Sequence, residues 1–250
     1  MSENDTFPYF TIITATYHSS KMLGRTADSL RAQTERDFEW FIIDGASTDD
    51  TVDEIKRAGS LVTYWSSEPD LGISDAWNKG ISRSNGRYIL ILNAGDTYDP
   101  DFLASVRQVA DGMRIVCSCA RLLTEAREYI GTFWAHPHKL HRGMHLPHNW
   151  CAVPKERYYE FGLYRNIPLS MDFDWFHKYF KRYGIDGFIV IPSELGVYHL
   201  GGKSDSGYVS GFRMNELIMV ENGRNWIMAK LYRILYTSNH WFQRKIGIFR

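Results

Sequence analysis

Apolar and polar positions in the first half of the chain follow a pattern that predicts strands and helices in turn. Short, β-rich apolar runs predict strands at 10–16, 40–44, 61–66 and 88–92. Apolar residues at helical spacing predict helices at 22–33, 51–58 and 75–84. Strands that alternate with helices are typical of a parallel sheet with helical crossovers. The sequence therefore predicts an α/β fold with a mostly parallel, Rossmann-like sheet flanked by helices.

Polar clusters stand at the ends of three of these predicted strands. They occupy residues 14–19, 44–50 and 93–99. In open α/β sheets, ligands bind outside the carboxyl ends of the strands. We therefore expect the three clusters to converge in space and form a nucleotide site, which does not by itself identify the reaction.

The second half of the chain is less regular. It holds a buried strand around Cys117 and Cys119, five histidines between 136 and 148, and a helix at about 173–183. We predict one domain over residues 1–215. Its nucleotide-sugar half spans about 9–112 and its acceptor half about 113–215.

Composition narrows the class of protein. The 250 residues are 44% hydrophobic and 23% charged, with a formal net charge of zero, so bulk charge does not favour a nucleic-acid binder. Three cysteines without metal-ligand spacing indicate free thiols in a reducing compartment. The polar N-terminus does not resemble a secretory signal, and no apolar run reaches the length of a membrane span. We expect a cytoplasmic protein, or one bound to the inner face of the plasma membrane.

The last 29 residues have a composition of their own. Residues 222–250 contain six basic residues and no acidic one, with aromatic residues interleaved. We predict a helical extension over 216–250. Basic and aromatic residues on a helix favour contact with an anionic membrane surface. Packing of the aromatic residues on the main domain, with the charges in solvent, explains the same pattern equally well.

Two aspartates follow predicted strands. Asp96 lies in a glycine-containing turn after the strand at 88–92, where its carboxylate could bind Mg²⁺ or Mn²⁺. The alternative is that Asp96 caps the turn. Asp44 ends the strand at 40–44 and could accept a hydrogen bond from a base N–H such as that of uracil. Its alternative is an Asx-turn.

Other polar residues allow proton transfer or phosphate binding. Asp172 and Asp174 directly precede a predicted helix, so either is a general base or an N-cap. His148 and His199 are candidates for hydrogen bonds to phosphate or acceptor, although a lone histidine is more often structural.

Taken in order, these motifs resemble family 2 glycosyltransferases, in particular the branch found among colanic-acid and other bacterial polysaccharide transferases. The long matching segments are residues 11–17, 29–34, 38–49, 67–81 and 92–96. Shorter matches continue at 148–149, 170–174 and 201–204. The resemblance implies a GT-A fold.

The resemblance also implies roles for individual residues. The residues that would bind the nucleotide-sugar are Thr14, Thr16, Tyr17, Asp44, Asp75, Asn78, Lys79, Asn93, Ala94 and Lys203. Asp96, with His199, would hold Mn²⁺ or Mg²⁺, and Asp172 would be the catalytic base. Asn93 stands where the family's metal motif has its first acidic residue.

The implied activity is inverting transfer of a sugar from a nucleoside diphosphate donor, with UDP favoured. The acceptor would be a hydroxyl of a glycan or of a lipid-diphosphate-linked glycan in bacterial surface polysaccharide synthesis. A nucleotidyltransferase is one alternative, but the segment Tyr17–Lys21 lacks the glycines that grip a triphosphate. A non-catalytic glycan-binding scaffold on the same fold is the other.

Overall fold

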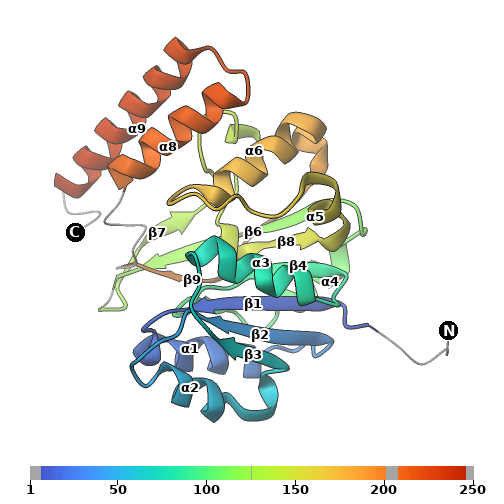
Figure 1. The fold of residues 1–250 in the computed structure, drawn as a ribbon. Helices are drawn as coiled ribbons and strands as arrows, with labels where there is room; N and C mark the ends of the chain where they lie inside the picture. The colour runs from blue at the N-terminus through green and yellow to red at the C-terminus, as the bar shows by residue number, and fades with distance from the viewer. Residues whose placement is uncertain (1–6, 125, 201–207, 246–250) are drawn as a thin grey trace.

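The first half of the chain folds as a parallel sheet with helical crossovers. The computed structural model describes residues 7–124, 126–200 and 208–245. Four strands lie side by side in the order β3-β2-β1-β4 and are parallel (Figure 1). Their bounds are β1 (Phe10–Thr16), β2 (Phe38–Asp44), β3 (Tyr64–Ser67) and β4 (Tyr88–Ile91). The crossovers are α1 (Ser20–Arg31), α2 (Thr51–Ala58) and α3 (Ile73–Arg83). The predicted alternation of strands and helices is confirmed.

The third strand is shorter than predicted. Leu61 belongs to a 3-10 turn, η1 (Gly59–Leu61), in which the amide of Val62 donates to the carbonyl of Gly59. The chain becomes extended only after this turn, so β3 begins at Tyr64.

The second half of the chain extends the same sheet with mixed pairing. The order continues as β8-β6-β9-β5, with β7 paired to β6. Strand β8 is antiparallel to both β4 and β6, whereas β6 and β9 are parallel. The strand bounds are β5 (Thr97–Tyr98), β6 (Ile115–Leu123), β7 (Tyr129–Phe133), β8 (Cys151–Pro154) and β9 (Phe188–His199). The remaining helical elements are α4 (Phe102–Val109), η2 (Pro137–Lys139), η3 (His148–Trp150), α5 (Lys155–Phe161), α6 (Met171–Tyr183) and η4 (Gly184–Gly187).

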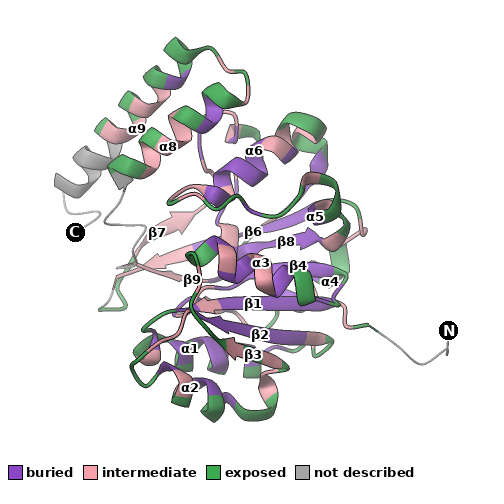
Figure 2. Ribbon diagram, in the orientation of Figure 1, coloured by how far each residue is buried: buried purple, intermediate pink, exposed green. Residues whose placement is uncertain are grey.

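Both faces of the central strands β1, β2, β4 and β8 are buried, which explains why these strands are nearly continuous apolar runs. Ile12 lies in one core cluster with residues of α1, α2 and α4. Its neighbour Ile13 lies in the other, with residues of α3, α5 and α6. This division follows from the two-residue period of a strand, which sends successive side chains to opposite faces. Figure 2 shows the buried strands between the helical layers.

The C-terminal residues form a helical hairpin of α8 (Tyr208–Glu221) and α9 (Trp226–Lys245). The predicted boundary at 215/216 therefore falls inside α8. The hairpin packs on the domain through buried Ile218, Met219 and Ala229, and the Tyr236 hydroxyl lies 2.8 Å from His145 Nε2. Much of its outer surface is exposed (Figure 2). No helix in the described ranges is long and apolar enough to cross a membrane.

Helix α3 approaches β1 closely at Gly80, which gives a test of the packing. A Cβ at Gly80 would lie 2.6 Å from Ile13 Cγ2, whereas a Cβ at Gly24 in α1 would meet nothing within 4 Å. We expect Gly80→Ala to lower the free energy of unfolding by about 1–2 kcal/mol because of overpacking. Gly24→Ala should raise it by up to about 1 kcal/mol, since alanine favours the helix. Urea denaturation measures both; equal effects would contradict the close approach.

Candidate active site

The side chain of Asp44 connects the carboxyl ends of the first three strands through hydrogen bonds. The parallel register places Thr16, Asp44 and Ser67 side by side on β1, β2 and β3. Asp44 is 0% exposed, and its Oδ1 accepts hydrogen bonds from Thr16 Oγ1 at 3.0 Å and Ser47 Oγ at 2.5 Å. Its Oδ2 accepts from Ser47 N at 2.8 Å and Ser67 Oγ at 2.7 Å. Four donors fill the lone pairs of this carboxylate, so in the structure Asp44 fixes the loops that follow the strands.

The loops after β1 and β2 have unusual backbone geometry. His18 and Ala46 both adopt positive φ angles, of 51° and 61°. The amide of His18 donates to Ser47 Oγ at 2.9 Å, which joins the two loops. Tyr17 is 53% exposed and its ring stacks on that of His18 at 4.2 Å. Strained residues of this kind cluster at ligand sites, and the Tyr17 ring presents an accessible surface there.

Thr14 and Thr16 lie deeper than Tyr17. Both are buried, and Thr14 Oγ1 accepts a hydrogen bond from the indole N–H of Trp40 at 2.9 Å. These two threonines are therefore buried beneath the site, whereas the side chain of Tyr17 is at the surface.

Asp96 joins the two halves of the domain. Its Oδ2 accepts a hydrogen bond from Asn149 Nδ2, and its Oδ1 accepts one from the amide of His199 at 3.1 Å. Helix α1 fixes the same turn, since Thr26 Oγ1 donates to the carbonyl of Asp96 at 3.0 Å and accepts from the amide of Gly95 at 2.9 Å. Gly95 has a φ of 103°, a conformation that side chains rarely adopt.

Asn93 brings an unsatisfied acceptor to this turn. Its Nδ2 donates to Asn149 Oδ1 at 3.3 Å. Its Oδ1 is buried and has no hydrogen-bond partner within the described ranges. A buried amide oxygen without a partner is costly, which suggests that a ligand completes the site.

These oxygens fit a divalent cation that also contacts phosphate. Mg²⁺ in phosphate-transfer sites is typically bound by one or two carboxylates together with substrate oxygens. Asp96 supplies such a carboxylate, and burial lowers the pKa of the neighbouring His199, so its imidazole is neutral at pH 7. Among the described residues, no three His, Cys, Asp or Glu side chains could share a metal ion. The donor set is thus too small to hold a cation without a substrate.

Asp172 lies in the first turn of α6. Its Oδ1 accepts the amide of Phe173 at 2.8 Å. Burial lowers the pKa of His148, and the negative charge of Asp172 opposes that shift. His148 Nε2 in turn lies 2.9 Å from the Tyr164 hydroxyl.

Asp174 has a different environment. It is 1% exposed and binds Lys178 Nζ at 2.6 Å and Arg165 Nη1 at 3.3 Å. Arg165 also binds Glu221 of α8 at 2.8 Å. Asp174 therefore belongs to a structural ion-pair network, whereas Asp172 forms no ion pair with another described residue.

The three predicted residues of α3 line an open cavity of about 450 Å³. Lys79 binds Glu68 at 3.0 Å and Asp75 at 3.4 Å, and the bond to Glu68 raises the pKa of the Lys79 ammonium group. Asn78 is fully engaged, because its amide exchanges two hydrogen bonds with the backbone of Tyr164, at 2.8 and 3.0 Å. Ala94 lies half-buried in the Asn93–Asp96 turn. Lys203 lies outside the described residues.

Sequence reasoning missed the function of Asn149 in this site. Asn149 is 53 residues from Asp96 along the chain, and nothing in its local pattern indicates the contact. The hydrogen bonds between Asn78 and Tyr164, which are 86 residues apart, could not be predicted from the local sequence either.

Residues 11–179, more than half of the chain, match the family model of glycosyl transferase family 2. The chain belongs to this family. An uncharacterized glycosyltransferase of Mycobacterium tuberculosis is 36% identical over 107 residues, which cover 42% of this chain and 41% of that relative. The chain thus matches about two-fifths of the length of this relative.

Solved structures confirm the GT-A fold of this family 2 glycosyltransferase. Staphylococcus aureus TarS 1–349 in complex with UDP-GlcNAc superposes with a TM-score of 0.68 at 12% identity, covering 93% of this chain and 72% of that chain. Glucosyl-3-phosphoglycerate synthase from Mycobacterium tuberculosis, solved with Mn²⁺, UDP and glucosyl-3-phosphoglycerate, has a TM-score of 0.60 at 13% identity. That match covers 87% of this chain and 81% of the synthase.

The contrast between Asp172 and Asp174 predicts different effects on stability. Asp174→Asn should lower the free energy of unfolding by about 1–3 kcal/mol, since it leaves Lys178 and Arg165 without their buried partner. Asp172→Asn should change it by less than about 1 kcal/mol, because that carboxylate contributes mainly through the helix dipole. Chemical denaturation at pH 7.5 measures both. Equal losses of stability would show that Asp172 is also structural.

Proposed function

We propose that this protein is an inverting glycosyltransferase that transfers a sugar from a nucleoside diphosphate, with UDP favoured, to a hydroxyl of a glycan. The observation that carries this proposal is the arrangement around η3. Asn149 of this turn binds Asp96 at the strand ends, and the charge of Asp172 acts on the preceding His148. This arrangement supports a site in which Asp96 would act on the diphosphate and Asp172 would act as the base.

The diphosphate would bind at the Asn93–Asp96 turn. Asp96, with the neutral His199 beside it, would hold Mn²⁺ or Mg²⁺, and the unsatisfied Asn93 Oδ1 would gain a partner. When bound, the cation neutralises the charge of the diphosphate leaving group. The structurally similar synthase was solved with Mn²⁺ and UDP, which supports this assignment. Lys203 would add a positive charge near the diphosphate.

The nucleoside would lie over the loops that Asp44 fixes. The exposed Tyr17 ring offers a stacking surface for the base or ribose. Asp44 would act on the nucleotide by shaping these loops, because its own lone pairs are occupied. Asp75 and Lys79, in the neighbouring cavity, would contact the donor from the other side.

Asp172 would accept the proton of the acceptor hydroxyl. The hydroxyl oxygen then forms a bond to the anomeric carbon as the bond from that carbon to the diphosphate oxygen breaks. The configuration inverts, so an α-linked donor gives a β-glycoside. Asp174 is occupied by Lys178 and Arg165, so this helix turn supplies no second carboxylate for a double displacement.

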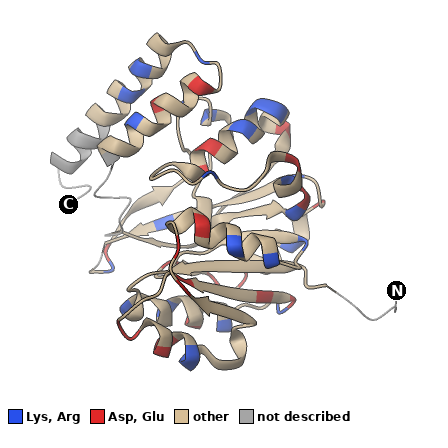
Figure 3. Cartoon of the chain, in the orientation of Figure 1, with Lys and Arg blue, Asp and Glu red and all other residues tan. Residues whose placement is uncertain are grey.

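The acceptor would be a lipid-diphosphate-linked glycan of bacterial surface polysaccharide synthesis, met at the inner face of the plasma membrane. The helical hairpin supports this part of the proposal. Its side chains include a row of exposed apolar residues, namely Leu217, Val220, Trp226, Ile227, Leu231, Ile234 and Leu235. The charged side chains described on α9 are all basic (Figure 3). A helix that combines exposed apolar and basic residues is suited to an anionic lipid interface.

Replacement of the candidate base tests the chemistry. Asp172→Asn should lower turnover by about 10²–10⁴-fold, because the acceptor hydroxyl loses its proton acceptor. The assay measures UDP release from a panel of UDP-sugars, with lipid-linked glycans extracted from bacterial membranes as acceptors. The variant should bind UDP as tightly as the wild type, which controls for folding. Near-normal turnover with intact UDP binding would contradict the assignment of Asp172.

The membrane contact is tested by removing apolar surface from α9. Leu231→Gln should weaken binding to vesicles of phosphatidylcholine and phosphatidylglycerol about fivefold, which corresponds to about 1 kcal/mol. Ile185→Gln is the matched control, because Ile185 is 49% exposed, close to the 47% of Leu231, but lies in η4 outside the hairpin. Vesicle cosedimentation measures both. Equal partitioning of wild type and Leu231→Gln would contradict a lipid-facing α9.

A further inference from the structure

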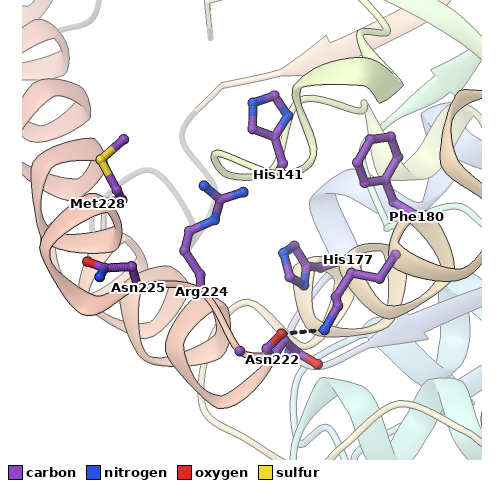
Figure 4. A pocket seen from close by; sticks show the side chains of 9 residues that line it. His141, His177, Phe180, Asn222, Arg224, Asn225 and Met228 are labelled. Atoms are coloured by element: carbon purple, nitrogen blue, oxygen red, sulfur yellow. Dashed lines mark hydrogen bonds between the residues drawn. The ribbon is translucent and has the colours of Figure 1, made fainter.

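A second cavity lies away from the strand ends, at the base of the helical hairpin. Its volume is about 520 Å³. It is formed by α6, the loop after η2 and the turn between α8 and α9. Figure 4 shows that the side chains of His141, His177 and Arg224 face the same space from three different segments. The donor site and the proposed base do not use this cavity.

His177 is the most informative residue of the cavity. It is 3% exposed, and its Nδ1 has no hydrogen-bond partner within the described part of the chain. An unsatisfied buried ring nitrogen costs free energy, and native proteins seldom contain one without a reason. The ring is directed toward the cavity (Figure 4), so a ligand there could supply the missing partner.

The surroundings of His177 are positively charged. Lys181, one turn further along α6, donates to the carbonyl of Asn222 at the end of α8. Arg224 has no carboxylate within ion-pair distance among the residues that the structure describes, and its guanidinium lies 5.5 Å from the Tyr232 ring centre. Burial and then the charges of Lys181 and Arg224 lower the pKa of His177 to about 4, while Asp174 opposes them. Asp174 itself is held by Lys178 and Arg165.

His141 completes the wall opposite His177. Its Nδ1 lies 2.8 Å from the carbonyl of His138, and its Nε2 accepts a hydrogen bond from Arg142 at 2.9 Å. Burial lowers the pKa of His141, and the charges of Arg142 and Arg224 act in the same direction. Positive charge therefore reaches the cavity from Lys181 of α6 and from Arg224 of the hairpin turn. Such a site disfavours a metal cation and favours an anion.

We infer that this cavity binds a phosphate group, as a phosphate monoester or a diphosphate. Arg224 supplies a planar guanidinium that matches two phosphate oxygens, and Lys181 supplies a second charge. Nδ1 of His177 donates to a third oxygen in the tautomer that places its proton there. Met228 of α9 lines the cavity and is 42% exposed, so a phosphate carried by a lipid and a soluble phosphate compound are both suitable ligands.

Titration with inorganic pyrophosphate in EDTA tests the site, since the chelator removes any divalent cation from the strand-end site. Pyrophosphate should bind the wild type, and Arg224→Gln should weaken this binding at least tenfold. Arg182→Gln is the matched control, because Arg182 is an exposed arginine of α6 that does not line the cavity. It should change the affinity less than twofold. Asp96→Asn should also leave it unchanged, which separates this site from the proposed donor site.

A spectroscopic measurement identifies the residue involved. With ¹⁵N-labelled histidine, the Nδ1 resonance of His177 should shift on addition of pyrophosphate in the wild type and in Arg182→Gln. His177→Gln assigns that resonance. Absence of pyrophosphate binding, equal affinity in Arg224→Gln, or an unchanged His177 resonance would each overturn the proposal.

Vesicles distinguish the two sources of phosphate. If the ligand is a lipid, binding to vesicles that contain phosphatidic acid should exceed binding to phosphatidylcholine vesicles, fall in Arg224→Gln and be displaced by pyrophosphate. If vesicle binding is the same in Arg224→Gln and resists pyrophosphate while the titration succeeds, the ligand is a soluble phosphate compound.

Discussion

The structure depends on how the carboxylate of Asp96 is held. One oxygen accepts from the side chain of Asn149 and the other from the backbone of His199. Asp96 follows the last strand of the parallel half, whereas Asn149 and His199 belong to the mixed half. Two hydrogen bonds to one buried carboxylate thus fix the two halves of the domain at the place where the diphosphate is proposed to bind. Hydrogen bonds to a charged group are stronger than those between neutral groups, which suits this junction.

The same constraint extends to η3 and α3. Asn149 and His148 are neighbours in η3, and His148 contacts Tyr164, whose backbone is bound by Asn78 of α3. The position of Tyr164 and α3 relative to Asp96 is therefore fixed through short, mostly buried contacts. At the ends of β1, β2 and β3, Asp44 fixes the loops in the same way, since its carboxylate accepts hydrogen bonds from Thr16, Ser47 and Ser67. The accessible groups of the site, such as Tyr17, lie on loops that these buried hydrogen bonds hold in place.

Much of the parallel half could be predicted because its signals are local. The helix at 51–58 was predicted with the bounds that the structure gives to α2, and the three polar clusters follow β1, β2 and β4, which are neighbouring parallel strands. The pairing of Asn149 with Asp96 could not be predicted, because it depends on how β8 joins β4 and β6. The residue pattern alone left Asp172 and Asp174 open as base or N-cap, and only the family resemblance implied Asp172. Lys178 is one turn from Asp174 on the same helix, but the contact of Arg165 with Asp174 forms only once the preceding loop packs on the helix. The roles of the site residues in donor binding remain predictions.

The most direct test of the account is thermal unfolding with UDP, with and without Mn²⁺, in the wild type and in Asp96→Asn. A ligand that binds only the folded state raises its stability by mass action, by about 2.7 kcal/mol at a hundred times the dissociation constant. The account predicts that UDP with Mn²⁺ raises the midpoint of the wild type, and that Asp96→Asn loses the Mn²⁺-dependent part of the rise. A rise that is the same without Mn²⁺ and the same in Asp96→Asn would contradict the assignment of Asp96.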